Sequence, residues 1–156
     1  MRSLAPLLAP FLLASCATQA PIATAAGCLS SADANREVVS HFYTQALVHK
    51  QVRPAFEAFT TPGFIEHKPD VAGGTREATI QFLEGLMKQV PNARWEVVRS
   101  VADRDMVAVH ARFQPAPGAP EYAIADFFRL ENCRIVEHWD VVAPPSTAKD
   151  NPNSRF

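Results

Sequence analysis

The sequence predicts an α+β fold in which three N-terminal helices pack on one face of a curved four-stranded antiparallel sheet. Two observations predict it. Over residues 32–90 the apolar side chains recur with the three-to-four-residue period of amphipathic helices. From residue 94 onward the period changes to two, and β-branched and aromatic residues dominate, which is typical of strands. Helices followed by a run of strands are the pattern of an α+β domain.

The helices are expected in the first half of the chain. The first should cover residues 32–49, and a short second helix should cover 54–59, where Pro54 can occupy the first turn. After the segment 64–74, Thr75 should cap a third helix, because a threonine side chain can accept a hydrogen bond from an N-terminal amide.

The strands are expected at about 94–102, 106–114, 122–131 and 135–142. Only short turns join them, and connections of that length require antiparallel neighbours, so the strands should form a meander. The tail 144–156 is rich in Pro and Asn and should be extended, either folded back over the domain or loose.

The N-terminus has the layout of a secretory signal. A basic Arg2 precedes an apolar run and then small residues up to Cys16. The sequence Leu13-Ala14-Ser15-Cys16 resembles the lipobox of bacterial lipoproteins, in which the leader is cut before an acylated cysteine. This resemblance implies a signal peptide over 1–15 and a lipid anchor and tether over 16–31. The protein would then be exported and membrane-anchored on the periplasmic side of the cell envelope. The alternative is an ordinary cleaved signal ending near Ala20.

Residues 32–143 are expected to form a single domain, since the mature chain has the length of one domain. With Cys16 acylated, Cys28 and Cys133 could form a disulfide, which an oxidising compartment permits. The alternative is two unpaired thiols. The formal net charge of -1, with no run of Lys or Arg, argues against a nucleic-acid partner.

Asp126 is the most unusual residue of the predicted sheet. It lies in Tyr122-Ala123-Ile124-Ala125-Asp126-Phe127-Phe128, where a carboxylate is costly unless it is paired or useful. His110, on the neighbouring strand, should come within one residue of facing it. If both point into a hollow between the sheet and the helices, they form a candidate catalytic acid/base pair. The alternatives are an Asp126 that faces solvent and a His110 on the surface.

Other candidates surround this expected hollow. His67 precedes a Lys-Pro pair and could hang at its rim as a general base, or be an isolated loop histidine. His138 and Asp140 share one face of the last strand, with Trp139 on the other, and that face could also be solvated. The candidate pocket residues are Tyr43, Phe128, His138, Trp139 and Asp140. No metal site is expected, since no set of ligands has the required spacing.

Several motifs together resemble the SnoaL-like polyketide cyclases of the nuclear transport factor 2-like superfamily. Phe64-Ile65-Glu66-His67-Lys68-Pro69 is similar to the family's Y-x-Q-H-x-P. The other motifs are Val107-Ala108-Val109-His110, Ala125-Asp126-Phe127-Phe128-Arg129 and Ile135-Val136-Glu137-His138-Trp139-Asp140-Val141. The tail Asn151-Pro152-Asn153-Ser154-Arg155-Phe156 resembles that of predicted aldol-condensation members.

The resemblance implies a cone-shaped α+β barrel with a deep pocket, working without metal or organic cofactor and commonly a homodimer through the outer sheet face. Asp126 is similar to the family's pocket carboxylic acid. His67 falls at the general-base position of ketosteroid isomerase, and Tyr43 falls near its oxyanion tyrosine. The chain differs from the pattern at Glu66, where close relatives have Gln.

These observations predict a cofactor-independent acid/base enzyme that acts on a small carbonyl compound by aldol, cyclase or isomerase chemistry. His67 or His110 would remove a proton beside the carbonyl, and Asp126 would donate a hydrogen bond to the enolate oxygen. The alternative function is a non-catalytic lipoprotein that binds an apolar ligand or a protein partner through the same fold.

Overall fold

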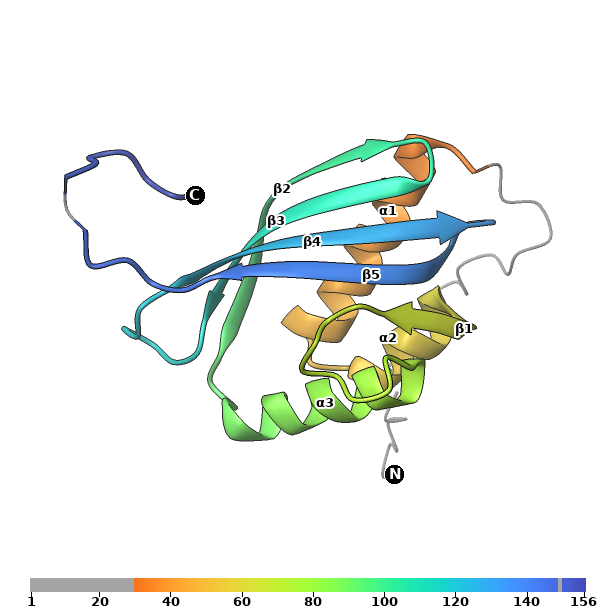
Figure 1. The fold of residues 1–156 in the computed structure, drawn as a ribbon, viewed down its shortest axis with the longest axis horizontal. Helices are drawn as coiled ribbons and strands as arrows, with labels where there is room; N and C mark the ends of the chain where they lie inside the picture. The colour runs from red at the N-terminus through yellow and green to blue at the C-terminus, as the bar shows by residue number, and fades with distance from the viewer. Residues whose placement is uncertain (1–29, 149) are drawn as a thin grey trace, which may run out of the picture.

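The alternating apolar residues of the second half of the chain build a twisted sheet, and the amphipathic helices of the first half cover one of its faces (Figure 1). The computed structural model describes residues 30–148 and 150–156. The helices are α1 (Ala32–Tyr43), α2 (Val52–Phe59) and α3 (Arg76–Gln89), and a π-helical turn, η1 (Thr44–Val48), follows α1. The strands are β1 (Thr60–Glu66), β2 (Arg94–Asp103), β3 (Met106–Gln114), β4 (Tyr122–Glu131) and β5 (Arg134–Ala143).

The helix ends follow the expected local chemistry. The Ser31 side chain accepts a hydrogen bond from the Ala34 amide and caps α1. The Thr75 side chain accepts one from the Ala78 amide and caps α3, as predicted. The first helix is not α-helical to residue 49, because the chain changes to the wider η1 turn directly after Tyr43.

The prediction of a purely antiparallel four-stranded sheet is wrong in one respect. The sheet has five strands in the order β1-β5-β4-β3-β2, and the additional strand β1 pairs in parallel with β5. The four strands expected from the sequence do not include Thr61-Pro62-Gly63, which contains two residues that are rare inside strands. Proline is tolerated on an edge strand, and β1 is the edge strand here.

The registers of the meander decide which side chains face the helices. β3 and β4 are aligned with Val109 opposite Asp126, and β4 and β5 are aligned with Phe128 opposite His138. Asp126 and His138 therefore lie on the inner face, two positions apart on neighbouring strands. On β1, Glu66 is paired with His138, which brings the end of the edge strand to the same place.

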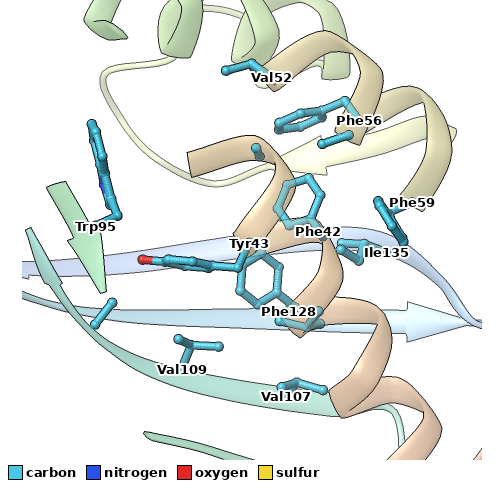
Figure 2. Close-up of a cluster of buried hydrophobic side chains, with 14 of the residues drawn as sticks. Phe42, Tyr43, Val52, Phe56, Phe59, Trp95, Val107, Val109, Phe128 and Ile135 are labelled. Atoms are coloured by element: carbon cyan, nitrogen blue, oxygen red, sulfur yellow. The ribbon is translucent and has the colours of Figure 1, made fainter. Parts of the chain in front are cut away.

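A cluster of aromatic and aliphatic side chains holds the helices to the inner face of the sheet (Figure 2). The Phe42 ring packs edge-on against Phe56 at 5.0 Å between centroids and against Phe128 at 5.8 Å. Such a cluster fixes α1 and α2 relative to β4. None of the helices in residues 30–148 and 150–156 has the length and hydropathy needed to cross a bilayer.

Candidate functional site

A cavity of about 340 Å³ lies between the helices and the inner face of the sheet. Most of its wall is apolar. The apolar side chains come from the three helices, from η1, from the start of β2 and β4, and from the end of β3. The apolar lining includes Phe42, Leu47, Phe56, Phe82, Leu83, Leu86, Trp95, Phe113 and Ile124. The charged lining side chains gather on β1, the residues after it, β4 and β5, so the cavity has one polar wall.

Asp126 lies on this polar wall and is only 7% exposed. Its Oδ1 is 3.2 Å from Nε2 of His138. Its Oδ2 is buried and has no hydrogen-bond partner among the described residues. A buried carboxylate oxygen without a partner is energetically costly, and such an atom is available to a bound molecule.

His138 lies between two carboxylates. Its Nδ1 is 2.9 Å from both carboxylate oxygens of Glu66, while its Nε2 faces Asp126. Burial disfavours the charged ring, but the hydrogen bonds to Asp126 and Glu66 outweigh it and raise the pKa of His138 from 6.5 to about 9. The ring is therefore an imidazolium at neutral pH.

The backbone around Glu66 holds its side chain against His138. The Glu66 amide donates to the carbonyl of Gly74 at 2.8 Å, and the next amide, of His67, donates to the carbonyl of His138 at 2.9 Å. The Lys68 amide donates to Glu66 Oε1 at 2.9 Å. The carboxylate therefore has partners on two sides, and Glu66 is 6% exposed.

Tyr43, at the C-terminal end of α1, adds a hydroxyl to the same cavity. Figure 2 shows this hydroxyl pointing away from the rings of Phe42 and Phe56. It is buried and has no hydrogen-bond partner within the part of the chain that the structure describes. Burial first, and then the charge of the Asp126 carboxylate and its hydrogen-bonding interaction with the hydroxyl, raise the pKa of Tyr43 well above 10. The two groups therefore face each other, although no contact between them has full hydrogen-bond geometry, and the hydroxyl keeps its proton and can donate it to a bound molecule.

A second ion pair lies beside this group. Lys68 Nζ donates to Asp140 Oδ2 at 2.7 Å, and both side chains line the cavity. Desolvation lowers the pKa of Lys68, but the Asp140 carboxylate outweighs it, so the net change is upward. The ammonium is thus committed to Asp140 and is not free to pair with a ligand.

His67 and Trp139 do not line the cavity, which corrects their prediction as site residues. His67 follows Glu66 directly and points to the opposite face of the sheet, where it stacks on Trp139 at 4.5 Å between centroids and an interplanar angle of 5°. Its Nε2 is 3.9 Å from Glu137, another side chain of that outer face. The alternation of side chains along a strand is the physical reason.

His110 also lies on the outer face, so the prediction that it shares a face with Asp126 is wrong. It is paired with Ala125, one position away from Asp126, and a shift of one residue reverses the face. The tail folds back there, and the ring of Phe156 stacks on His110 at 5.7 Å. The Arg112 guanidinium lies 4.4 Å from the centre of the same Phe156 ring.

Tyr43, Phe128, His138 and Asp140 line the cavity together with Asp126. Glu66 and Lys68 line it too, although the sequence did not predict them as site residues. Both belong to the motif compared with Y-x-Q-H-x-P, and the departure from Gln at Glu66 was the one signal that pointed to this position. Without the parallel pairing of β1 and β5, that signal could not be connected to His138.

The predicted acylation site Cys16 and the predicted disulfide partner Cys28 lie outside the described residues. Cys133 lies in the β4–β5 turn, where Asn132 and Cys133 both have positive φ, as the turn of a two-residue hairpin requires. Among residues 30–148 and 150–156, no three His, Cys, Asp or Glu side chains are arranged to hold a metal ion.

Comparison with known proteins identifies the domain. Residues 39–138 match the family model described as "SnoaL-like domain". No curated protein sequence matches. Among solved structures, a candidate SnoaL-like polyketide cyclase from Jannaschia sp. CCS1 is 22% identical with a TM-score of 0.59, covering 74% of this chain and 91% of its own. A candidate ketosteroid isomerase from Kribbella flavida DSM 17836 is 16% identical with a TM-score of 0.59, covering 81% of this chain and 88% of its own. These likenesses show the fold.

Proposed function

Because this chain belongs to the SnoaL-like domain family, we propose that its cavity catalyses proton transfer on a small carbonyl compound, with Asp126 as the general base. One observation carries the proposal. Asp126 Oδ2 and the Tyr43 hydroxyl are both buried, both at the same cavity, and both without a partner among the described residues. One atom can accept a proton and the other can donate a hydrogen bond, which is the combination that enolisation requires.

In the proposed step, the C–H bond next to the substrate carbonyl breaks and its proton moves to Asp126 Oδ2. The electron pair of that bond becomes the enolate, whose negative charge collects on the carbonyl oxygen. The Tyr43 hydroxyl donates a hydrogen bond to this oxygen, and its raised pKa keeps the proton on the tyrosine. His138 donates to Asp126 Oδ1 and fixes the orientation of the carboxylate. Return of the proton from Asp126 to another carbon or oxygen of the substrate completes an isomerisation. In an aldol closure, the enolate carbon forms a bond to a second carbonyl carbon, and the alkoxide that results takes the proton from Asp126, which regenerates the base.

The apolar wall supports a substrate that is largely hydrophobic. The charged groups of the polar wall are paired with each other: His138 with two carboxylates, and Lys68 with Asp140. With all five groups ionised their sum is one negative charge. A neutral carbonyl compound suits this cavity better than a carboxylate, since none of the cationic side chains that line it in the described part of the chain is left to pair with an anion.

The proposal is tested by proton exchange, which can be measured on model ketones while the natural substrate is still unidentified. A panel of hydrophobic ketones is incubated with the protein in heavy water, and loss of the α-proton signal is followed by NMR. Asp126→Asn should reduce the exchange rate by about 10²-fold or more, the usual contribution of a general base. Asp103→Asn, which removes an exposed carboxylate at the end of β2, is the matched control and should leave the rate unchanged.

Two other results would count against catalysis. Equal exchange rates for the wild type and Asp126→Asn would exclude Asp126 as the base. Binding of the ketones without any acceleration, detected by a change in the fluorescence of Trp95 in the cavity wall, would favour the non-catalytic ligand-binding alternative.

The proposed setting is the cell envelope, with Cys16 acylated and a disulfide between Cys28 and Cys133. Mass spectrometry of the protein isolated from membranes, with and without reduction, tests both modifications.

A homodimer through the outer sheet face is also proposed. It is supported by apolar side chains exposed there, with Val141 63% and Phe127 37% exposed. Sedimentation of the wild type against Phe127→Asp tests it, and a wild-type monomer would contradict it.

A further inference from the structure

The two ring nitrogens of His138 both face acceptors, and this arrangement has a fixed proton requirement. An ionised carboxylate can only accept hydrogen bonds, and a neutral imidazole has only one N–H. With Glu66 at Nδ1 and Asp126 at Nε2, a neutral ring would direct a lone pair at one of the two carboxylates. Two protons must therefore be shared by the three groups if both contacts are to be hydrogen bonds.

We propose that Glu66 is a positioning residue that holds the second proton on His138, so that the ring presents Nε2–H to Asp126 Oδ1 and leaves Asp126 Oδ2 as the acceptor for the substrate proton. Glu66 does not touch the reacting atoms in this scheme. It acts through the ring, and the two contacts of 2.9 Å to Nδ1 are the observation that carries the inference. The catalytic consequence rests on the proposed function, whereas the charge of the ring can be measured without a substrate.

The charge balance explains why a glutamate serves this purpose better than a glutamine. When Asp126 takes a proton from substrate, His138 and Glu66 remain as a neutral pair of opposite charges. With glutamine at position 66, the same step would leave a buried positive charge with no carboxylate partner, which is costly in a low-dielectric site. The ring would then give up its proton more easily, and a neutral ring supports Asp126 less well.

Asp126 and Glu66 are the two side chains that act on the charge of the His138 ring. Besides His138, the charged and titratable groups that line the same cavity come from four elements or their ends: Tyr43 of α1, Glu66 and Lys68 of β1 and the residues after it, Tyr122 and Asp126 of β4, and Asp140 of β5. Lys68 is bonded to Asp140, so its positive charge is largely balanced by that partner. The two carboxylates in contact with the ring are therefore the dominant influence, and the raised pKa of His138 follows from them.

The first test measures the ring directly. In the full-length protein labelled with ¹⁵N-histidine, the His138 ring signals are followed by NMR over the alkaline range, with assignment from His138→Gln. In the wild type, the midpoint of the His138 titration should lie near pH 9. In Glu66→Gln the midpoint should fall by about one pH unit or more, the usual effect of losing one contacting opposite charge. Glu66→Asp, which keeps the charge, should restore at least part of the difference.

The matched control is Glu137→Gln. Glu137 is the neighbour of His138 on β5, but its side chain lies on the other face of the sheet and is close to His67 rather than to the His138 ring. This variant should leave the His138 midpoint unchanged. An unchanged midpoint in Glu66→Gln would overturn the inference. So would a wild-type His138 ring that carries a single N–H at neutral pH.

The second test links the ring to the reaction. The alkaline limb of the ketone exchange rate should move to lower pH in Glu66→Gln by the same amount as the NMR midpoint. One outcome is that Asp126→Asn leaves the exchange rate unaffected while Glu66→Gln still lowers the titration midpoint of the His138 ring. In that case the proposed function fails and the charge-setting role of Glu66 stands. If Asp126→Asn abolishes exchange and neither quantity moves in Glu66→Gln, only the inference about Glu66 fails.

Discussion

The charge on His138 should make the folded protein less stable as the pH rises from neutral to alkaline. The contacting carboxylates raise its pKa from 6.5 to about 9 in spite of burial. A group whose pKa is higher in the folded state contributes its full stabilisation below the unfolded value, and this contribution is lost as the pH rises through the folded value. The affected range therefore extends from about pH 6.5 to about pH 9.

The size of the effect follows from the same two values. A pKa difference of about 2.5, at about 1.4 kcal/mol for each pKa unit, corresponds to about 3 kcal/mol in the free energy of unfolding. A domain of ordinary stability has about 5–15 kcal/mol in total, so the loss should be visible in a denaturation curve. His138→Gln removes this dependence, and it should also destabilise the protein near neutral pH because it leaves two carboxylates buried without their shared cation.

Urea unfolding of the wild type and His138→Gln at a series of pH values measures the difference. The wild type should be more stable by about 3 kcal/mol or more near pH 6, and the gap between the two should narrow by about 3 kcal/mol by about pH 10. His110→Gln, on the outer face, is the control and should follow the wild type throughout. A gap that stays constant over the whole range would mean that the ring is not charged in the folded state, and the reasoning would be refuted.

Three further predictions concern the framework of the site. Gly74→Ala should destabilise the protein and weaken ligand binding, because Gly74 has a φ of +59° and a new Cβ would lie 2.7 Å from the carbonyl oxygen of Glu66. The control is Gly63→Ala, where a new Cβ would have no atom within 4 Å, and its effect in thermal unfolding and binding assays should be much smaller. Phe56→Ala should cost about 3–5 kcal/mol in urea unfolding, because it removes a large side chain that is only 2% exposed and leaves its space at the cavity wall unfilled. Thr75→Ala should cost about 1 kcal/mol by the same measurement, since it removes the cap of α3.

The sequence predicted most of the fold because the period of the apolar residues is a strong signal over long elements. The third helix and the four strands of the meander lie within a few residues of their expected places. The edge strand β1 escaped prediction, since it pairs with a strand about seventy residues later and contains a proline and a glycine. Long-range parallel pairing leaves no local pattern in a sequence.

The site was less predictable than the fold because it depends on the face that each side chain occupies. Asp126 was singled out by chemistry alone, since a carboxylate amid apolar residues needs a reason. His110 was placed near it correctly in register but on the wrong face, because a count along a loop has an uncertainty of at least one residue. The imidazole that does contact Asp126 is that of His138. Its alternation with neighbours on the last strand is equally consistent with a solvated face, so the local sequence did not indicate this contact.

The buried charges of this domain are difficult to explain by stability alone. Replacing a buried ion pair with well-packed apolar residues is often neutral or stabilising, so the fold itself does not require Glu66, Asp126 and His138 at this position. The surrounding wall is already apolar, and side chains of that kind could have continued across it. Among the described residues, one carboxylate oxygen and one tyrosine hydroxyl at the same cavity are buried without a hydrogen bond, and this arrangement lowers the stability of the fold. That cost has a physical rationale when a ligand supplies the missing partners, and proton transfer is the chemistry for which these two groups are suited.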